Sequence, residues 1–210
     1  MRIAIIGAGN VGGTLGTGWA RRGHEVIFGV RDASDPRLKE LLSRAGGKAR
    51  AAGVKEAAAA AEVVALTVPW PAAQDALRSA GDLRGKILLD CTNPLKPDLS
   101  GLTVGYTASG GEQVAGWAPG ARVVKIFNTT GFPNMANPEY PEGRSMMLYC
   151  GDDPAAKKVA AQLATDLGFE PYDVGSLAEA RLLEPFALVW IHLAVLQKMG
   201  TQFAFRLMRR

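Results

Sequence analysis

The sequence has few of the residues that commonly build metal centres or disulfide frameworks. Its 210 residues include two cysteines and two histidines. Cys91 and Cys150 each end an apolar stretch, while His24 and His192 lie far from both cysteines and from each other in the chain. This arrangement excludes the ligand spacings of common zinc sites. We expect no bound metal and two buried free thiols, which is the usual state of cysteine in a reducing compartment.

Long apolar runs and concentrated charge are also scarce. The most apolar late stretch, residues 186–196, is too short for a membrane span and contains His192. The amino terminus lacks a signal-peptide pattern, because Arg2 is followed at once by a strand-like run. The net charge of +4 is scattered along the chain, which disfavours a nucleic-acid partner. These features predict a cytoplasmic protein that binds neither membranes nor nucleic acids.

No set of side chains typical of acid–base or nucleophilic catalysis stands out. Ser109 has no histidine near it in the sequence, and Glu112 can simply be solvated. Glu179, Arg181 and Glu184 are expected on a helix surface, with the alternative that Arg181 or Glu184 fixes a loop near the site. Hydride transfer between two cofactors needs little beyond two rings held at the right distance away from water. Reduction of a carbonyl or imine normally needs a proton donor, and we identify no catalytic residue.

Glycine is abundant, and one glycine-rich turn organises the chain. Residues 2–6 are an apolar, β-branched run typical of a buried strand, and residues 11–22 have a helical pattern. Between them Gly7, Gly9 and Gly12 form the motif G-x-G-x-x-G. In this context the three glycines allow a tight turn, a close approach to a pyrophosphate and close helix–strand packing, respectively. The alternative is a glycine-rich turn that binds nothing.

The end of the second predicted strand, residues 24–30, bears on the choice of cofactor. Arg31 follows this strand and Asp32 comes next. In dinucleotide-binding sheets an acidic residue here holds the ribose hydroxyls of NAD, whereas an arginine accommodates the extra phosphate of NADP. A guanidinium suits a phosphate because its donors form a planar fork. The order of the two residues favours NADP(H) over NAD, and Asp32 leaves NAD open.

Strand and helix patterns alternate over the rest of the chain, which is typical of an α/β fold with a parallel sheet. We expect further helices at residues 35–44, 55–61, 72–80, 109–117 and 155–167, and strands at 48–53, 60–67, 86–90, 121–127, 145–150 and 169–174. Residues 132–142 are expected to be a loop. The predicted fold is a doubly wound, Rossmann-type, mostly parallel sheet. It forms an NADP-binding domain over residues 1–175, followed by a C-terminal helical segment over 176–210, interrupted at Pro185, that packs on the binding edge or on a dimer partner.

Polar residues follow three successive buried strands, at Thr67, Asn93 and Asn128. Ligands of doubly wound sheets bind at the carboxyl edge of the strands, so these side chains are candidates for orienting a ring or an amide. Trp70 stands between two prolines at the first of these exits. It is equally well a stacking partner for a cofactor or part of the core.

These motifs together resemble the family of F420-dependent NADP oxidoreductases, whose relatives include reductase domains of ferric reductases that pass hydride to a flavin. The resemblance covers nearly the whole chain. The segments that carry it are residues 3–12, 29–32, 67–70, 90–95, 125–131, 150–153, 184–185 and 190–194.

The resemblance implies that NADP(H) lies on the glycine turn, with Asn10, Val11 and Arg31 around its phosphates. It places the nicotinamide near Val68, Pro69 and Asn93. The second substrate, coenzyme F420 or alternatively FMN or FAD, would be bounded by Asn128, Thr129 and the segment near residues 200–201. A homodimer through the C-terminal helices is the expected assembly. A reductase of a small organic substrate and a non-enzymatic NADP(H) sensor remain as alternatives.

Overall fold

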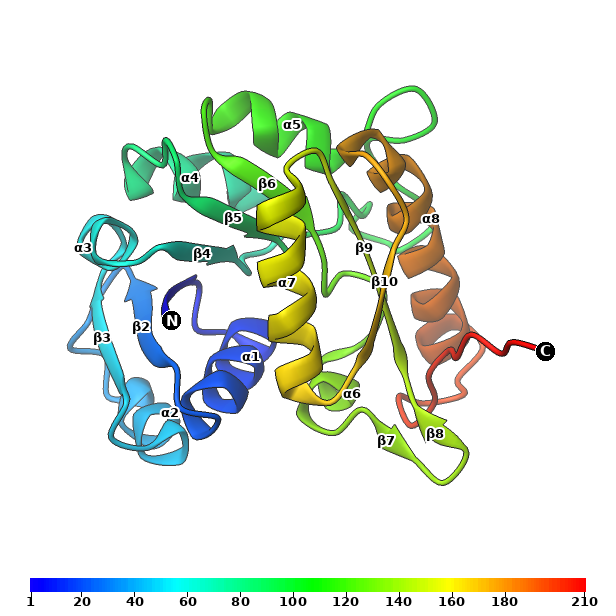
Figure 1. Cartoon of the computed structure of the whole chain (residues 1–210), viewed down its shortest axis with the longest axis horizontal. Coiled ribbons are helices and arrows are strands. Elements are labelled where there is room, and N and C mark those ends of the chain that lie inside the picture. The colour runs from blue at the N-terminus through cyan, green and yellow to red at the C-terminus, as the bar shows by residue number, and fades with distance from the viewer.

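A single eight-stranded sheet crosses the molecule in the order β10-β9-β6-β5-β4-β1-β2-β3, in a computed structural model that describes residues 1–210 (Figure 1). The six strands from β3 to β6 are parallel, β9 runs antiparallel to β6, and β10 is parallel to β9. This order confirms the predicted doubly wound, mostly parallel sheet. The strands are β1 (Arg2–Ile6), β2 (Glu25–Val30), β3 (Ala49–Gly53), β4 (Val63–Leu66), β5 (Ile87–Asp90), β6 (Arg122–Lys125), β9 (Met146–Gly151) and β10 (Glu170–Asp173).

Helices cover both faces of the sheet because alternate residues of its central strands point to opposite sides. Ile3 and Ile5 of β1 belong to a core beneath α1, α2 and α7, whereas Ala4 and Ile6 belong to a second core beneath α3, α4 and α5. The six helices are α1 (Asn10–Arg21), α2 (Arg37–Ala45), α3 (Val54–Ala60), α4 (Ala73–Ala80), α5 (Gly110–Trp117) and α7 (Pro154–Leu167). Each falls where the sequence pattern predicts a helix, to within a few residues.

The segment predicted as a loop at residues 132–142 is instead partly regular. Phe132–Ala136 form the short helix α6, and β7 (Glu139–Tyr140) pairs with β8 (Gly143–Arg144) in a hairpin outside the main sheet. The loop prediction was wrong because a proline in the first turn of α6 and a two-residue turn after it look the same in sequence as an irregular connection. The strand predicted over 121–127 ends at Lys125, since Phe127 has a left-handed backbone with φ +62°.

The last helix, α8 (Ala180–Ile191), lies alongside β9 at the side of the sheet (Figure 1). Pro185 lies inside this helix and does not interrupt it, contrary to our prediction, and a π-helical turn continues from His192 to Leu196. The final residues are not helical. They run back as an extended tail, in which Phe205 accepts a hydrogen bond from the Met146 amide and Phe203 stacks on Trp190 at 5.3 Å.

Both cysteines are buried free thiols, as predicted. Burial raises the pKa of Cys91, and it raises the pKa of Cys150 to about 12, so neither side chain is a thiolate at neutral pH. None of the helices combines the length and the apolar character that crossing a bilayer requires.

The N-cap of α7 can be tested by substitution. Asp153 precedes the helix, and its carboxylate accepts a hydrogen bond from the Ala156 amide at 2.6 Å. We expect Asp153→Ala to lower the free energy of unfolding by about 1 kcal/mol, because an amide of the first turn loses its partner. Urea unfolding measures the change. Gln74→Ala, on the exposed surface of α4, is the control, and an equal loss in both variants would contradict the capping role.

Candidate active site

A cleft of about 1180 Å³ opens at the carboxyl ends of β1, β2 and β4. The strand order reverses between β1 and β4, and such switch points are where doubly wound sheets bind ligands. The cleft wall includes the glycine turn, Arg31, Val68 and Pro69, together with Phe132 of α6. A second hollow, of about 820 Å³, lies among charged surface side chains at the amino ends of the strands, where Arg2 pairs with Glu25. The first cleft is therefore the candidate site.

Two glycines of the turn are required by the packing of the protein itself. Gly7 has φ +102°, and a Cβ there would lie 2.9 Å from Val68 Cγ1. A Cβ on Gly12 would lie 2.0 Å from the Gly7 carbonyl oxygen and 2.4 Å from Thr67 Oγ1. The Thr67 hydroxyl stabilises the turn by donating a shared hydrogen bond to the carbonyls of Ile6 and Gly7, each at 2.9 Å. Thr67 thus supports the turn from the protein side.

Gly9 differs from its two neighbours in the motif. A Cβ built on Gly9 meets no atom within 4 Å, and φ at this residue is an ordinary −75°. Neither backbone conformation nor internal packing demands a glycine at this position. The open space beside Gly9 belongs to the cleft.

The start of α1 faces the same space with its backbone amides uncapped. Gly9 is the N-cap residue, no side chain caps the helix, and its first turn holds no acidic residue. The first amides of a helix lack partners within the helix, and its positive dipole end attracts anions. Asn10 and Val11 are the first two residues of this turn. The arrangement can hold a phosphate group without further side chains.

Arg31 lies at the rim of the cleft with its side chain exposed, where β2 ends. The Asp32 carboxylate already has local partners, since one of its oxygens accepts hydrogen bonds from the Ser34 hydroxyl at 2.6 Å and the Ser34 amide at 2.9 Å. These two hydrogen bonds lower the pKa of Asp32. Of the two charged residues that follow β2, Arg31 is therefore the one whose hydrogen-bond donors face solvent.

The exit of β4 places Trp70 apart from Val68 and Pro69. Val68 and Pro69 line the cleft. Trp70 instead packs against Trp117 of α5, with ring centroids 5.2 Å apart, and its ring lies close to Gly110. Trp70 therefore lies behind the cleft wall, between β4 and α5.

The exits of β5 and β6 bring Asn93 and Asn128 together. The Asn93 side chain donates to the Asn128 carbonyl at 2.8 Å, and the Asn128 side chain donates to Asn93 Oδ1 at 3.1 Å and to the Leu183 carbonyl at 3.2 Å. Asn128 and Thr129 are both buried, and the Thr129 hydroxyl contacts Met147 Sδ at 3.8 Å. These residues form a bonded group, the asparagine corner, at the exits of β5 and β6, and none of the three is among the residues that line the cleft.

Phe127 creates the bend that brings Asn128 to this corner. A left-handed backbone is strained for a bulky side chain and persists only where the surroundings enforce it. The buried Phe127 ring meets Trp19 at 5.6 Å and Phe169 at 6.3 Å. These contacts hold the ring in the core while the backbone leaves the sheet.

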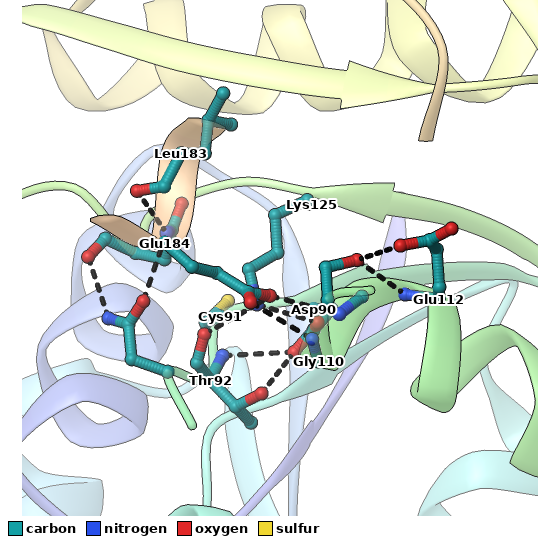
Figure 2. Close-up of polar contacts among 12 residues, drawn as sticks. Asp90, Cys91, Thr92, Gly110, Glu112, Lys125, Leu183 and Glu184 are labelled. Atoms are coloured by element: carbon teal, nitrogen blue, oxygen red, sulfur yellow. Dashed lines mark hydrogen bonds and ion pairs between the residues drawn. The ribbon is translucent and has the colours of Figure 1, made fainter. Parts of the chain in front are cut away.

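A buried ionic cluster beneath the asparagines was missed from the sequence. Lys125, Asp90 and Glu184 are fully buried, with the lysine 2.9 Å from Asp90 Oδ2 and 2.8 Å from Glu184 Oε1 (Figure 2). Placing Glu184 on the helix surface was wrong, because its side chain points inward to Lys125. The available signal was the presence of Asp90 and Lys125 in the apolar runs 87–91 and 123–127, since charges are rarely buried unless they are paired.

The start of α5 beside this cluster is capped by the side chain of Ser109. Ser109 Oγ accepts from the Glu112 amide at 3.1 Å and donates to Glu112 Oε2 at 2.8 Å, so the N-cap side chain satisfies an amide of the first turn. The Arg181 guanidinium lowers the pKa of Glu112 by donating to its carboxylate, with Nε 2.9 Å from Oε2. Arg181 of α8 thus holds α5 rather than a loop of the cleft.

Comparison with known proteins agrees with this geometry. The family model described as "NADP oxidoreductase coenzyme F420-dependent" matches residues 2–94. The F420-dependent NADP reductase of Methanothermobacter thermautotrophicus is 32% identical over 209 residues, covering 93% of this chain and 90% of that protein. Rat metalloreductase STEAP3 is 30% identical over 188 residues, covering 89% of this chain but 36% of that protein. The chain thus spans about a third of that relative's length.

Solved structures show the same relationship. The crystal structure of a candidate F420-dependent NADP reductase from Arthrobacter sp. FB24 superposes with a TM-score of 0.89 and 33% identity over the whole of both chains. An imine reductase from Streptomyces aurantiacus shares the fold, with a TM-score of 0.67 at 20% identity. The resemblance found in the sequence is confirmed. The chain belongs to the family of F420-dependent NADP oxidoreductases and is an NADP-dependent oxidoreductase.

Proposed function

We propose that this protein transfers a hydride between NADP(H) and a deazaflavin or flavin, with coenzyme F420 as the favoured acceptor. The observation that carries the cofactor part is the open space at Gly9, next to two glycines that the protein's own packing requires. Neither packing nor backbone conformation requires a glycine at residue 9, and a glycine is expected where a pyrophosphate must approach the backbone.

The residues present fit NADP(H) along the cleft. The amides at Asn10 and Val11 would hold the pyrophosphate, with Gly7, Gly9 and Gly12 shaping the turn. Arg31 would bind the 2′-phosphate, because its guanidinium is exposed at the rim while Asp32 is bonded to Ser34.

The nicotinamide end would lie toward Val68, Pro69 and the corner of Asn93, Asn128 and Thr129. Thr67 would act by supporting the turn, and Trp70 by backing the wall. When bound, the reduced nicotinamide supplies the hydride. The ionisable groups beneath this corner are buried and bonded to one another. That favours a reaction in which the protein holds two rings and excludes water, over one that needs a protein proton donor.

F420 is favoured as the acceptor because the archaeal relative named as an F420-dependent NADP reductase aligns over nearly its whole length. STEAP3 aligns over 36% of its length, so FMN or FAD remains the second choice.

The assembly is part of the proposal. We infer that residues 1–175 bind the cofactor and that residues 176–210 cover the binding edge or meet a second copy. Support for a homodimer comes from Leu182, Val189 and Leu196, spaced seven residues apart with 59%, 50% and 43% of their surface exposed.

Anaerobic oxidation of NADPH, followed by its absorbance, tests the acceptor. F420 and FMN are offered separately, and we expect rapid oxidation with F420. Turnover with FMN alone would assign the flavin instead. NADPH binding with neither acceptor reduced would contradict the proposal and favour a reductase of a small organic substrate or an NADP(H) sensor.

Gly9→Ala tests the space reserved for the pyrophosphate. The added methyl group meets no protein atom, so the free energy of unfolding should change by no more than about 1 kcal/mol. NADPH affinity should fall at least about tenfold, a cost of about 1.4 kcal/mol. Calorimetric titration measures the affinity. Gly116→Ala, at an equally open exposed position of α5, is the matched control, and wild-type affinity in Gly9→Ala would contradict the assignment.

Arg31→Ala tests the phosphate assignment. A charge-assisted hydrogen bond contributes about 1.5–3 kcal/mol, so NADPH should bind about 10–100-fold more weakly while NADH binding changes little. Arg50→Ala removes another exposed arginine, which lines the hollow at the amino ends of the strands, and should alter neither affinity. Equal losses for NADPH and NADH in Arg31→Ala would remove Arg31 from the phosphate site.

A further inference from the structure

Lys125 joins three segments of the chain at one buried point. Its ammonium donates to Asp90 Oδ2 at 2.9 Å, to the Thr92 carbonyl at 2.6 Å and to Glu184 Oε1 at 2.8 Å (Figure 2). A lysine ammonium has three donors, so every proton is used. The side chain has no exposed surface. Lys125 therefore ties the exit of β5 and the helix α8 to the end of β6.

Glu184 carries this connection on to α5. Its carboxylate accepts hydrogen bonds from the Gly110 amide at 2.9 Å and the Gly111 amide at 3.0 Å. A Cβ on Gly110 would lie 3.1 Å from Glu184 Oε1, and one on Gly111 would lie 3.0 Å from Ala180 Cβ. The two glycines at the start of α5 therefore allow α8 to approach this closely.

The residue before Glu184 holds the other side of the corner. The Leu183 carbonyl accepts the Asn128 side chain, which also bonds Asn93. Two consecutive residues of α8 thus reach both strand exits. Leu183 bonds Asn128 after β6, and Glu184 is connected to the exit of β5 through Lys125. A shift of Lys125 would displace both asparagines.

Lys125 remains protonated at neutral pH because two carboxylates surround it. Burial alone would lower the pKa of Lys125, but Asp90 and Glu184 together raise it above its usual value. Asp90 is further satisfied by the Thr92 amide at 3.0 Å and hydroxyl at 2.7 Å. The amides at the start of α5 offset the second carboxylate.

We propose that Lys125 is a positioning residue for hydride transfer, which holds Asn93 and Asn128 in register with α8 at the nicotinamide end of the cleft. The proposal rests on the proposed function. It separates two parts of the site: the phosphates are bound at the glycine turn and Arg31, while the geometry of the reacting ring depends on Lys125 and Glu184.

The test compares a double variant with a matched control. Lys125→Met alone would leave two carboxylates buried without their cation, so it is combined with Glu184→Gln, which removes one of the two charges and leaves Asp90 bonded to the Thr92 amide and hydroxyl. The control is Lys86→Met, because the Lys86 ammonium also bonds the main chain, donating to the carbonyls of Ala59 and Ala61, but does so at the amino end of β5. Three quantities are measured: NADPH affinity, the single-turnover rate of hydride transfer to F420, and the NMR signals of the Asn93 and Asn128 side-chain amides without cofactor.

In the folded double variant we expect NADPH affinity within about threefold of wild type and a hydride-transfer rate at least about tenfold lower, because small misplacements of reacting groups cost rate far more than binding. The two amide signals should shift. Lys86→Met should leave all three measurements unchanged. A wild-type rate, or unmoved amide signals, in the double variant would overturn the positioning role. If wild-type protein transfers no hydride to F420 or FMN, the proposed function fails, and the amide signals still decide the role of Lys125.

Discussion

The close approach of α1 to the exits of β1 and β4 is the constraint on which the cleft depends. A Cβ on Gly12 would overlap the Gly7 carbonyl oxygen and the Thr67 hydroxyl, so helix and strands can pack this tightly only without that atom. The same approach directs the uncapped amides of α1 into the open space beside Gly9. A local packing requirement thereby produces a surface suited to phosphate. The family to which the chain belongs is named for a cofactor that carries such groups.

A second constraint acts through charge, at the exits of β5 and β6. Breaking a buried ion pair by removing one partner costs about 3–5 kcal/mol, because the remaining charge is left without compensation. Lys125, Asp90 and Glu184 therefore stabilise one arrangement of β5, β6 and α8 against alternatives. The C-terminal helix is attached to the sheet by a charged side chain in addition to the apolar contacts of Ala180 and Leu183.

The glycine turn and the asparagine corner are stabilised by different interactions. The glycine turn relies on backbone and the near absence of side chains, as expected where a ligand must approach the main chain. The asparagine corner relies on side chains bonded to one another and on the strained backbone of Phe127. Substitutions at the glycine turn and at the asparagine corner therefore act on different kinds of interaction. Relatives that share the turn can differ in the molecule they act on, and the named relatives include both NADP reductases and metalloreductases.

The sheet class, the glycine turn, the eight main strands and the six helices that cover the sheet were predictable from the sequence, because strand and helix periodicities and the G-x-G-x-x-G spacing are local properties. The helix α6 and the β7–β8 hairpin were not. The sequence also placed Arg31, Asn93 and Asn128 at strand ends, since parallel strands bring their carboxyl ends to one edge. It could not place Trp70 behind the wall or Glu184 inside the protein, because each side chain turns toward α5, a helix distant in sequence. The buried partnership of Lys125 with residues 35 and 59 positions away exists only once the sheet and α8 have packed. That pairing is a property of the folded protein, because a charge is buried where long-range packing supplies its counter-charge.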